Sequence, residues 1–450
     1  MPPYGNVHAE SGFLIAARDE STDGTVQDGT LGGSGPQSRC RWRGAGGDYC
    51  GGFVGGAPTR PIEVRSTGFT MRVLYVESPI GFGGSLTGLL HLIRELPPEV
   101  EPILVTSFDP APYIELPEGL VHRRVAVGGR RGSVGGPLAG AWRYFRDDVR
   151  PWRRAVDELI REFAPDVVHA NNALSANWGA GQAARRRGVP SISHQKGFEY
   201  PGRLTRWLVR QSSFTRHIAT SGAIAEHLVE LGLPRERIST IYEPVIGPVE
   251  APPTRSGNGR LVVGMHSILG PWKGQHIVIE AAADALRRWR TDFELVVAGT
   301  SPAGETDYLD ELQRLAARLG VADRVRFAGH QRDVYQFLAT IDVAVHASVG
   351  PEPFGRVAAE AMLCGVPTIV TTGGGPEEYV RHGETGLHVP CNDVAAMSAA
   401  LERLAASPEL RRRMGAAARE YAIAAFDPSR LTTQVVDLYH ALVETPSERK

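Results

Sequence analysis

The chain has 450 residues, of which 42% are hydrophobic, and its charges nearly cancel, with 49 Lys and Arg against 50 Asp and Glu. This length can hold two or three domains with sizeable cores, and the balanced charge excludes nucleic-acid binding driven by bulk charge. No apolar run approaches the roughly 20 residues of a membrane-spanning helix.

The first 69 residues differ in composition from the rest. They are rich in Gly, Ser, Thr, Pro and Asp and have neither helical nor strand periodicity. Two explanations stand: residues 1–69 are a disordered leader, or the start is mis-called and translation begins at Met71, which is the explanation we favour. None of the four cysteines has a metal-ligand spacing or belongs to a disulfide framework, so we expect a reducing, cytoplasmic location.

From Met71 onward, apolar strand patterns alternate with helical ones. Such alternation predicts a parallel, doubly wound α/β sheet, here forming a Rossmann-like domain over residues 71–245. The expected strands are 72–77, 101–107, 166–170, 190–194, 216–220 and 238–242, and the expected helices lie near 85–96, 152–163, 175–188 and 222–232.

A Pro- and Gly-rich linker, 246–259, precedes a second alternating series that predicts another Rossmann-like domain, 260–428. Two such domains create a ligand cleft between the carboxyl ends of their sheets. A final helix near 429–443, within a segment 429–450, carries apolar residues at helical spacing. The expected strands are 261–265, 293–298, 324–328, 341–346, 367–371 and 386–389.

Two features of the first half follow strand ends. Gly83 and Gly84 open a helix after the first strand, where glycines permit a tight turn and the helix N-terminus favours an anion; the alternative is a plain turn. His169 and His194 end later strands, where ligands of parallel sheets gather, although a lone histidine is often an ordinary core residue.

Aromatic and cationic residues alternate around Trp142, Arg146 and Trp152, and again around Arg203 and Trp207. Such a surface can contact anionic lipid headgroups. The alternative is a solvated helix face with packed Trp side chains.

The second half contains the strongest pattern. Glu352-Pro353-Phe354-Gly355 precedes a helix that contains Glu360, and this strand-loop-helix turn directs amides and a helix dipole at an anion. Two carboxylates beside an anion site suit the hydroxyls of a sugar nucleotide, because a carboxylate accepts strongly from a diol. The alternative is a pair of ordinary charges at a helix N-terminus. Upstream lies Pro-Trp-Lys-Gly-Gln around Lys273, and downstream the loop with Gly374 and Gly375.

Over residues 71–450 these motifs resemble retaining glycosyltransferases of family four, which have the GT-B fold and two Glu with seven residues between them. The resemblance implies that the last helix crosses back to the first domain. It also implies roles for the matching residues. Glu360 grips the ribose, Glu352 and His194 contact the donor sugar, Lys273 neutralises the leaving diphosphate, and further donor contacts come from Pro353, Phe354 and Gly355. We assign Gly83, Gly84, Gly374 and Gly375 to donor binding as well; the alternatives are that the first glycine pair faces the acceptor and that the second lets the domains close.

The resemblance implies retaining transfer from a nucleotide-sugar donor to a glycan or lipid-linked acceptor, in cell-surface glycan, glycolipid or polysaccharide synthesis. No Asp-x-Asp pattern stands at a strand end, so we expect no metal and no cofactor beyond the donor as co-substrate. Two alternatives remain: a sugar-nucleotide 2-epimerase of the same architecture, or a catalytically silent nucleotide-binding protein.

One departure from the family pattern weakens the expected diphosphate site. An Arg usually stands five or six residues before the Lys, but this chain has Ile268 and Ser267 there. Either His266 or a neighbouring Arg compensates, or the diphosphate binds more weakly.

Overall fold

A computed structural model describes residues 71–77, 84–110, 114–125, 137–200, 202–250, 260–288, 292–301 and 307–444. The segment 1–69, Gly83 and residues 251–259 of the linker lie outside these ranges. Predictions for those residues are therefore not addressed by the structure.

The first sheet has seven parallel strands in the order β3-β2-β1-β4-β5-β6-β7. The chain leaves the centre through β2 and β3 and returns to the other side of β1 through β4, which creates a topological switch point between β1 and β4. Strands covered on both faces read as continuous apolar runs, and residues 73–76 are accordingly all buried. The strands are β1 (Met71–Glu77), β2 (Val100–Thr106), β3 (Val121–Arg124), β4 (Val167–Asn171), β5 (Ser191–Gln195), β6 (Arg216–Ala219) and β7 (Ile238–Thr240).

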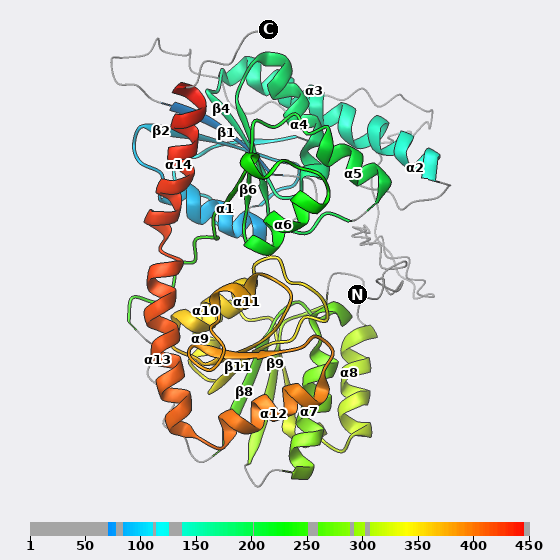
Figure 1. The fold of residues 1–450 in the computed structure, drawn as a ribbon, viewed down its shortest axis with the longest axis vertical. Coiled ribbons are helices and arrows are strands. Elements are labelled where there is room, and N and C mark those ends of the chain that lie inside the picture. Colours follow the sequence, from blue (N-terminus) through cyan, green and yellow to red (C-terminus); the bar gives the residue numbers. More distant parts are fainter. Residues whose placement is uncertain are drawn as a thin grey trace, which may run out of the picture. The chain divides into compact units, whose positions relative to one another are not determined.

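Helices cover this sheet, as Figure 1 shows in cyan and green. Two of them, α2 and α5, and the edge strand β3 were not predicted from the sequence, because all three are short. In addition, α5 and β3 are rich in arginine, and none of the residues 140–143 of α2 is buried. The helices are α1 (Gly84–Arg94), α2 (Pro137–Arg143), α3 (Arg150–Phe163), α4 (Leu174–Arg187), α5 (Arg203–Arg210) and α6 (Gly222–Glu230), with a π-helical segment η1 (Tyr144–Val149) and a 3₁₀ turn η2 (Arg235–Arg237).

The second sheet repeats the plan with six parallel strands in the order β10-β9-β8-β11-β12-β13. Its switch point lies between β8 and β11, so ligand-binding residues are expected after these two strands. The strands are β8 (Leu261–His266), β9 (Phe293–Ala298), β10 (Val325–Gly329), β11 (Val343–His346), β12 (Thr368–Thr371) and β13 (Gly386–Val389).

The helices of the second half surround a core formed mainly by Leu, Val, Ile and Ala side chains. α10 follows β11 directly and packs against both α9 and α13. The helices are α7 (Gln275–Arg288), α8 (Asp307–Arg318), α9 (Val334–Leu338), α10 (Arg356–Leu363), α11 (Gly375–Tyr379), α12 (Val394–Ala405) and α13 (Pro408–Ala425), with 3₁₀ turns η3 (Pro271–Lys273) and η4 (Ala322–Arg324).

The last helix, α14 (Pro428–Glu444), packs on the first sheet. It contacts α1 and β4, and its residues Leu431, Val435 and Tyr439 share one buried cluster with Val73 of β1. Figure 1 shows α14, in red, beside the first sheet. The chain therefore returns to its first half after completing its second.

Two sets of contacts join the halves. Tyr242, which follows β7, packs in an aromatic cluster with Phe354, Tyr379 and Phe426 of the second half. Nearby, the carboxylate of Glu378 in α11 accepts hydrogen bonds from the amides of Gly222 (2.9 Å) and Ala223 (2.7 Å) at the start of α6. The negative charge thus meets the positive end of a helix dipole.

Candidate active site

The loop before α10 places Glu352 and Glu360 on either side of a helix N-terminus. Gly355 caps the helix in the left-handed region, with φ of 76°. A Cβ at this position would lie 2.5 Å from Pro376 Cγ, so only glycine fits. Glu352 consequently stays in the loop, and Glu360 lies in the second turn of α10. This agrees with the prediction of one carboxylate before the helix and the other inside it.

Three side chains converge on one oxygen of Glu352. Lys273 Nζ and Ser348 Oγ each donate to Oε2 at 2.7 Å, and His346 Nε2 lies 3.4 Å from the same atom. Burial alone would raise the pKa of Glu352, but Lys273 and His346 outweigh it and hold the pKa far below its ordinary value. The described hydrogen bonds and ion pairs all use Oε2, which leaves Oε1 for a ligand.

The loop that carries Lys273 is locked to the loop that carries Glu352. Gly274 has φ of 76°, and a Cβ there would lie 1.9 Å from the carbonyl oxygen of Ala347. In addition, the Val349 amide donates to the Trp272 carbonyl at 3.0 Å. These backbone contacts fix the Lys273 side chain beside Glu352.

Gly374 and Gly375 support the same loop from its other side. A Cβ on Gly374 would lie 2.3 Å from the Glu352 carbonyl oxygen, and the Gly375 amide donates to that oxygen at 2.8 Å. Phe354 directs its side chain into the buried aromatic cluster, so only its backbone is left to face a ligand. The donor contacts predicted for Pro353, Phe354 and the glycines stay predictions.

Glu360 belongs to a row of partly and fully buried charges. Arg356 Nη2 lies 3.4 Å from Glu360 Oε1, Arg356 Nη1 lies 3.5 Å from Glu243 Oε2, and Lys196 Nζ lies 3.4 Å from Glu243 Oε1. Burial raises the pKa of Glu360, with Arg356 opposing the shift. Arg356 and Glu243 were not predicted as site residues from the sequence. Arg356 directly follows the Glu352–Gly355 motif, and this position in the sequence could have marked it as a site residue.

His194, at the end of β5, is buried and its Nδ1 lies 3.1 Å from Nε2 of His169. Its other nitrogen, Nε2, has no hydrogen-bond partner among the described residues. Gly84 lies next to the Arg356 side chain, since a Cβ on this glycine would lie 3.5 Å from Arg356 Cδ. The structure therefore brings the start of α1 to the charged row.

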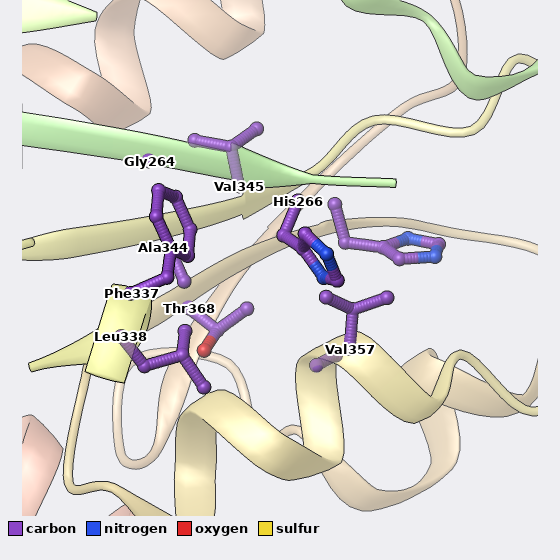
Figure 2. A pocket seen from close by; sticks show the side chains of 10 residues that line it. Gly264, His266, Phe337, Leu338, Ala344, Val345, Val357 and Thr368 are labelled. Carbon is purple, nitrogen blue, oxygen red and sulfur yellow. The ribbon is translucent and has the colours of Figure 1, made fainter. Parts of the chain in front are cut away.

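A small cavity lies at the carboxyl ends of β8 and β11, at the switch point of the second sheet. Figure 2 shows His266, Phe337 and Val357 around it, and His346 is also part of its lining. Burial lowers the pKa of His266. A neutral imidazole carries no permanent charge, which disfavours His266 as the replacement for the missing arginine.

The positions where that arginine was expected supply no cation. Ser267 Oγ accepts from Gln275 Nε2 at 2.9 Å, and Ile268 is exposed. Within the described ranges, no group of three or more His, Cys, Asp or Glu side chains could hold a metal ion. No helix in that part of the chain is long and apolar enough to cross a membrane.

Comparison with known proteins identifies the family. Residues 82–246 match the model described as Glycosyltransferase Family 4, and residues 250–421 match the model described as Glycosyl transferases group 1. The lipopolysaccharide core biosynthesis glycosyltransferase LpsE of Rhizobium meliloti is 31% identical over 63% of this chain and 78% of its own length. The chain belongs to glycosyltransferase family 4. The D-inositol 3-phosphate glycosyltransferase of Frankia alni is 30% identical over 61% of this chain and 75% of its own length.

The fold of this family 4 glycosyltransferase is confirmed as GT-B. Anabaena HepE in complex with UDP superposes with a TM-score of 0.69 at 23% identity, covering 83% of this chain and all of HepE. At that identity the likeness shows the fold alone. Two Rossmann-like parallel sheets, predicted from the alternating pattern of the sequence, are the architecture observed.

Proposed function

We propose that the protein is a retaining glycosyltransferase that moves a sugar from a nucleotide-sugar donor to a hydroxyl group of a glycan or lipid-linked acceptor, in cell-surface glycan, glycolipid or polysaccharide synthesis. The observation that carries the proposal is the arrangement at α10: Lys273 and Glu352 meet before its N-terminus, and Glu360 follows in its second turn. Relatives that act in lipopolysaccharide core synthesis and a fold neighbour that binds UDP support it.

Each residue then has a distinct task. Lys273 and the amides at the start of α10 stabilise negative charge on the leaving diphosphate, because a preorganised cation and helix N-terminus require no rearrangement as charge develops. Glu360 accepts from the ribose hydroxyls, and Glu352 offers Oε1 to the sugar. The departing phosphate oxygen takes the acceptor's proton on the face it leaves, so the anomeric configuration is retained without a protein nucleophile.

The test is a donor screen by calorimetry and thermal shift with UDP, GDP and ADP sugars, followed by NMR of the product's anomeric proton. Transfer with retention supports the proposal. Isomerisation of the donor would favour the epimerase, and binding without turnover would favour the silent nucleotide-binding protein.

We further propose that turnover needs no metal ion, since the charge of the diphosphate is met by Lys273 and by backbone amides. Activity should be unchanged by a chelator. Activity that is lost with chelator and restored by Mn²⁺ would contradict this.

For the acceptor, we propose that the protein is cytoplasmic and makes peripheral contact with the inner face of an anionic membrane. Trp142 and Trp207 are 59% and 47% exposed, and the Arg146 guanidinium lies 4.2 Å from the Trp142 ring centroid. Exposed Trp beside Arg is typical of side chains at a lipid interface. Flotation with anionic vesicles should recover more protein than flotation with neutral ones, and Trp142→Ala should reduce the difference.

A further inference from the structure

Four buried polar side chains form a chain of contacts from the C-terminal helix to His194. Tyr75 lies in β1, His169 in β4, His194 in β5 and Tyr439 in α14. The hydroxyl oxygens of Tyr75 and Tyr439 are 3.1 Å apart, the Tyr439 oxygen is 2.6 Å from His169 Nδ1, and His169 Nε2 is 3.1 Å from His194 Nδ1. No member is more than 2% exposed.

Both histidines are neutral at neutral pH. Burial, reinforced by the nearby charge of Lys196, lowers the pKa of His169 to about 3 and holds the pKa of His194 well below its ordinary value. A neutral imidazole has one N–H donor and one acceptor nitrogen. The hydrogen bonds along the chain therefore determine which nitrogen of His194 carries the proton.

Hydroxyl hydrogens rotate, so the chain can run in two directions. In the first, Tyr75 donates to Tyr439, Tyr439 donates to His169 Nδ1, and His169 donates from Nε2 to His194. This direction leaves one group without a partner among the described residues, the Nε2–H of His194. In the reverse direction, Tyr439 donates to Tyr75, and the hydroxyl hydrogen of Tyr75 then has no acceptor among the described residues. The unprotonated Nε2 of His194 also lacks a donor among them.

The first direction is favoured for two reasons. It leaves fewer buried polar groups unmet, and an unpaired buried donor is costly. The 2.6 Å contact between Tyr439 and His169 also suits a hydroxyl donor, because O–H donors make shorter hydrogen bonds than N–H donors.

We propose that Tyr439 and His169 are positioning residues that hold His194 in its Nε2–H tautomer, so that His194 presents a hydrogen-bond donor to an oxygen of the donor sugar. The sugar as its partner rests on the function proposed above. The tautomer of His194, in contrast, is determined by the protein alone and does not depend on that function. The C-terminal helix thereby becomes part of the donor site, although it lies at the far end of the sequence.

The decisive measurement is a long-range ¹H–¹⁵N correlation spectrum of the full chain labelled with ¹⁵N-histidine, recorded without added nucleotide. The His194 signals are assigned by their disappearance in His194→Gln. Protonation at Nε2 is the expected result, and protonation at Nδ1 overturns the proposal. This measurement is made on the wild-type protein, so it does not depend on a variant that folds.

A matched pair of variants tests the role of the tyrosines. Tyr439→Phe removes the donor to His169, and we expect a second His194 tautomer to become populated. Tyr75→Phe removes one hydroxyl from the same cluster but leaves Tyr439 donating to His169, so the tautomer should not change. An unchanged spectrum in Tyr439→Phe, or a changed one in Tyr75→Phe, overturns the proposal.

The functional measurement separates sugar recognition from general damage. Tyr439→Phe should lower kcat/KM for the nucleotide sugar by about tenfold, the worth of roughly one hydrogen bond, and leave the Kd of UDP unchanged. Equal weakening of UDP binding would show a merely structural role and overturn the proposal. If the Nε2–H tautomer is found but the wild type transfers no sugar, the proposed function fails while the tautomer assignment stands.

Discussion

Lys273 Nζ lies 2.7 Å from Oε2 of Glu352, so the cation expected at the leaving diphosphate and the carboxylate expected at the sugar form one ion pair. Ser348 and His346 contact the same oxygen. A diphosphate that attracts Lys273 would therefore weaken one of the three contacts to Glu352, while the other two would still hold the Glu352 side chain. Under the proposed function, the pair would link charge on the leaving diphosphate to the position of the carboxylate proposed to face the sugar.

Lys273→Ala should abolish measurable sugar transfer and change how stability depends on pH. In the wild type, the pKa of Glu352 is depressed, so the ion pair stabilises the fold above the unfolded pKa of about 4.3 and is lost only at far lower pH. Without Lys273, less positive charge opposes the effect of burial, so the pKa of Glu352 in the folded protein should rise. We expect a loss of about 2–3 kcal/mol at pH 7 and a smaller loss near pH 4, measured by urea unfolding.

Lys273→Arg is the matched control for this experiment. It keeps the charge but replaces a compact ammonium with a planar group, so stability should largely return and turnover only in part. An equal loss of stability at pH 7 and pH 4 for Lys273→Ala would contradict the ion-pair explanation.

Glu360→Ala should weaken UDP binding by about 10- to 100-fold, because charge-assisted hydrogen bonds to the ribose are worth about 1.5–3 kcal/mol. Calorimetry with UDP measures the effect. 2′,3′-Dideoxy-UDP, which lacks the ribose hydroxyls, should bind the wild type and the variant equally. If the variant weakens both ligands to the same extent, Glu360 does not contact the ribose.

Removing one member of the buried Lys196–Glu243 pair should destabilise the protein strongly. Their side chains are 4% and 5% exposed, and an uncompensated buried charge costs about 3–5 kcal/mol. Because Arg356 still lies 3.5 Å from Glu243 Oε2, we expect Lys196→Met to lose an amount near the lower end of this range in urea unfolding. Lys196→Met combined with Glu243→Gln should recover part of it, since the carboxylate that has lost Lys196 and keeps only its 3.5 Å contact with Arg356 is then neutral. A double variant as unstable as the sum of its single variants would contradict the pairing.

Gly274→Ala should be far more damaging than Gly119→Ala. Both glycines have nearly the same positive φ, 76° and 77°, so both substitutions incur a backbone cost of about 1 kcal/mol. Only at Gly274 would the added Cβ meet the Ala347 carbonyl, while at Gly119 nothing lies within 4 Å. Sugar transfer and Tm report the difference, and equal effects would show that the contact between the two loops does not position Lys273.

The sequence predicted most of the sheet architecture because buried parallel strands are short apolar runs between helices. Phe293–Ala298 and Gly386–Val389 appear in the structure with the predicted bounds. The edge strand β3 escaped prediction because its sequence, Val121-His122-Arg123-Arg124, is half-exposed and has no apolar run. Short α5 likewise has too few turns for a clear helical period.

The sequence motifs predicted where the two acidic residues lie, while their binding roles stay predictions. The spacing of Glu352 and Glu360 predicted one before the helix and one in its first or second turn, and the structure places Glu360 in the second turn. The partners of these residues could not be predicted, because pairs such as Arg356 and Glu243 are far apart in sequence and depend on how the halves meet. His346 is a lone histidine, and only its place at the end of β11 marked it.

The return of α14 to the first sheet decides how this enzyme could be recombined with relatives. Because Leu431, Val435 and Tyr439 complete the core built on β1 and α1, a hybrid that exchanges the second half should take its foreign segment only up to Phe426 and keep the native residues from Pro428 onward. A crossover placed after Glu444 would bury a foreign helix against an unrelated surface, whatever the quality of the transplanted half.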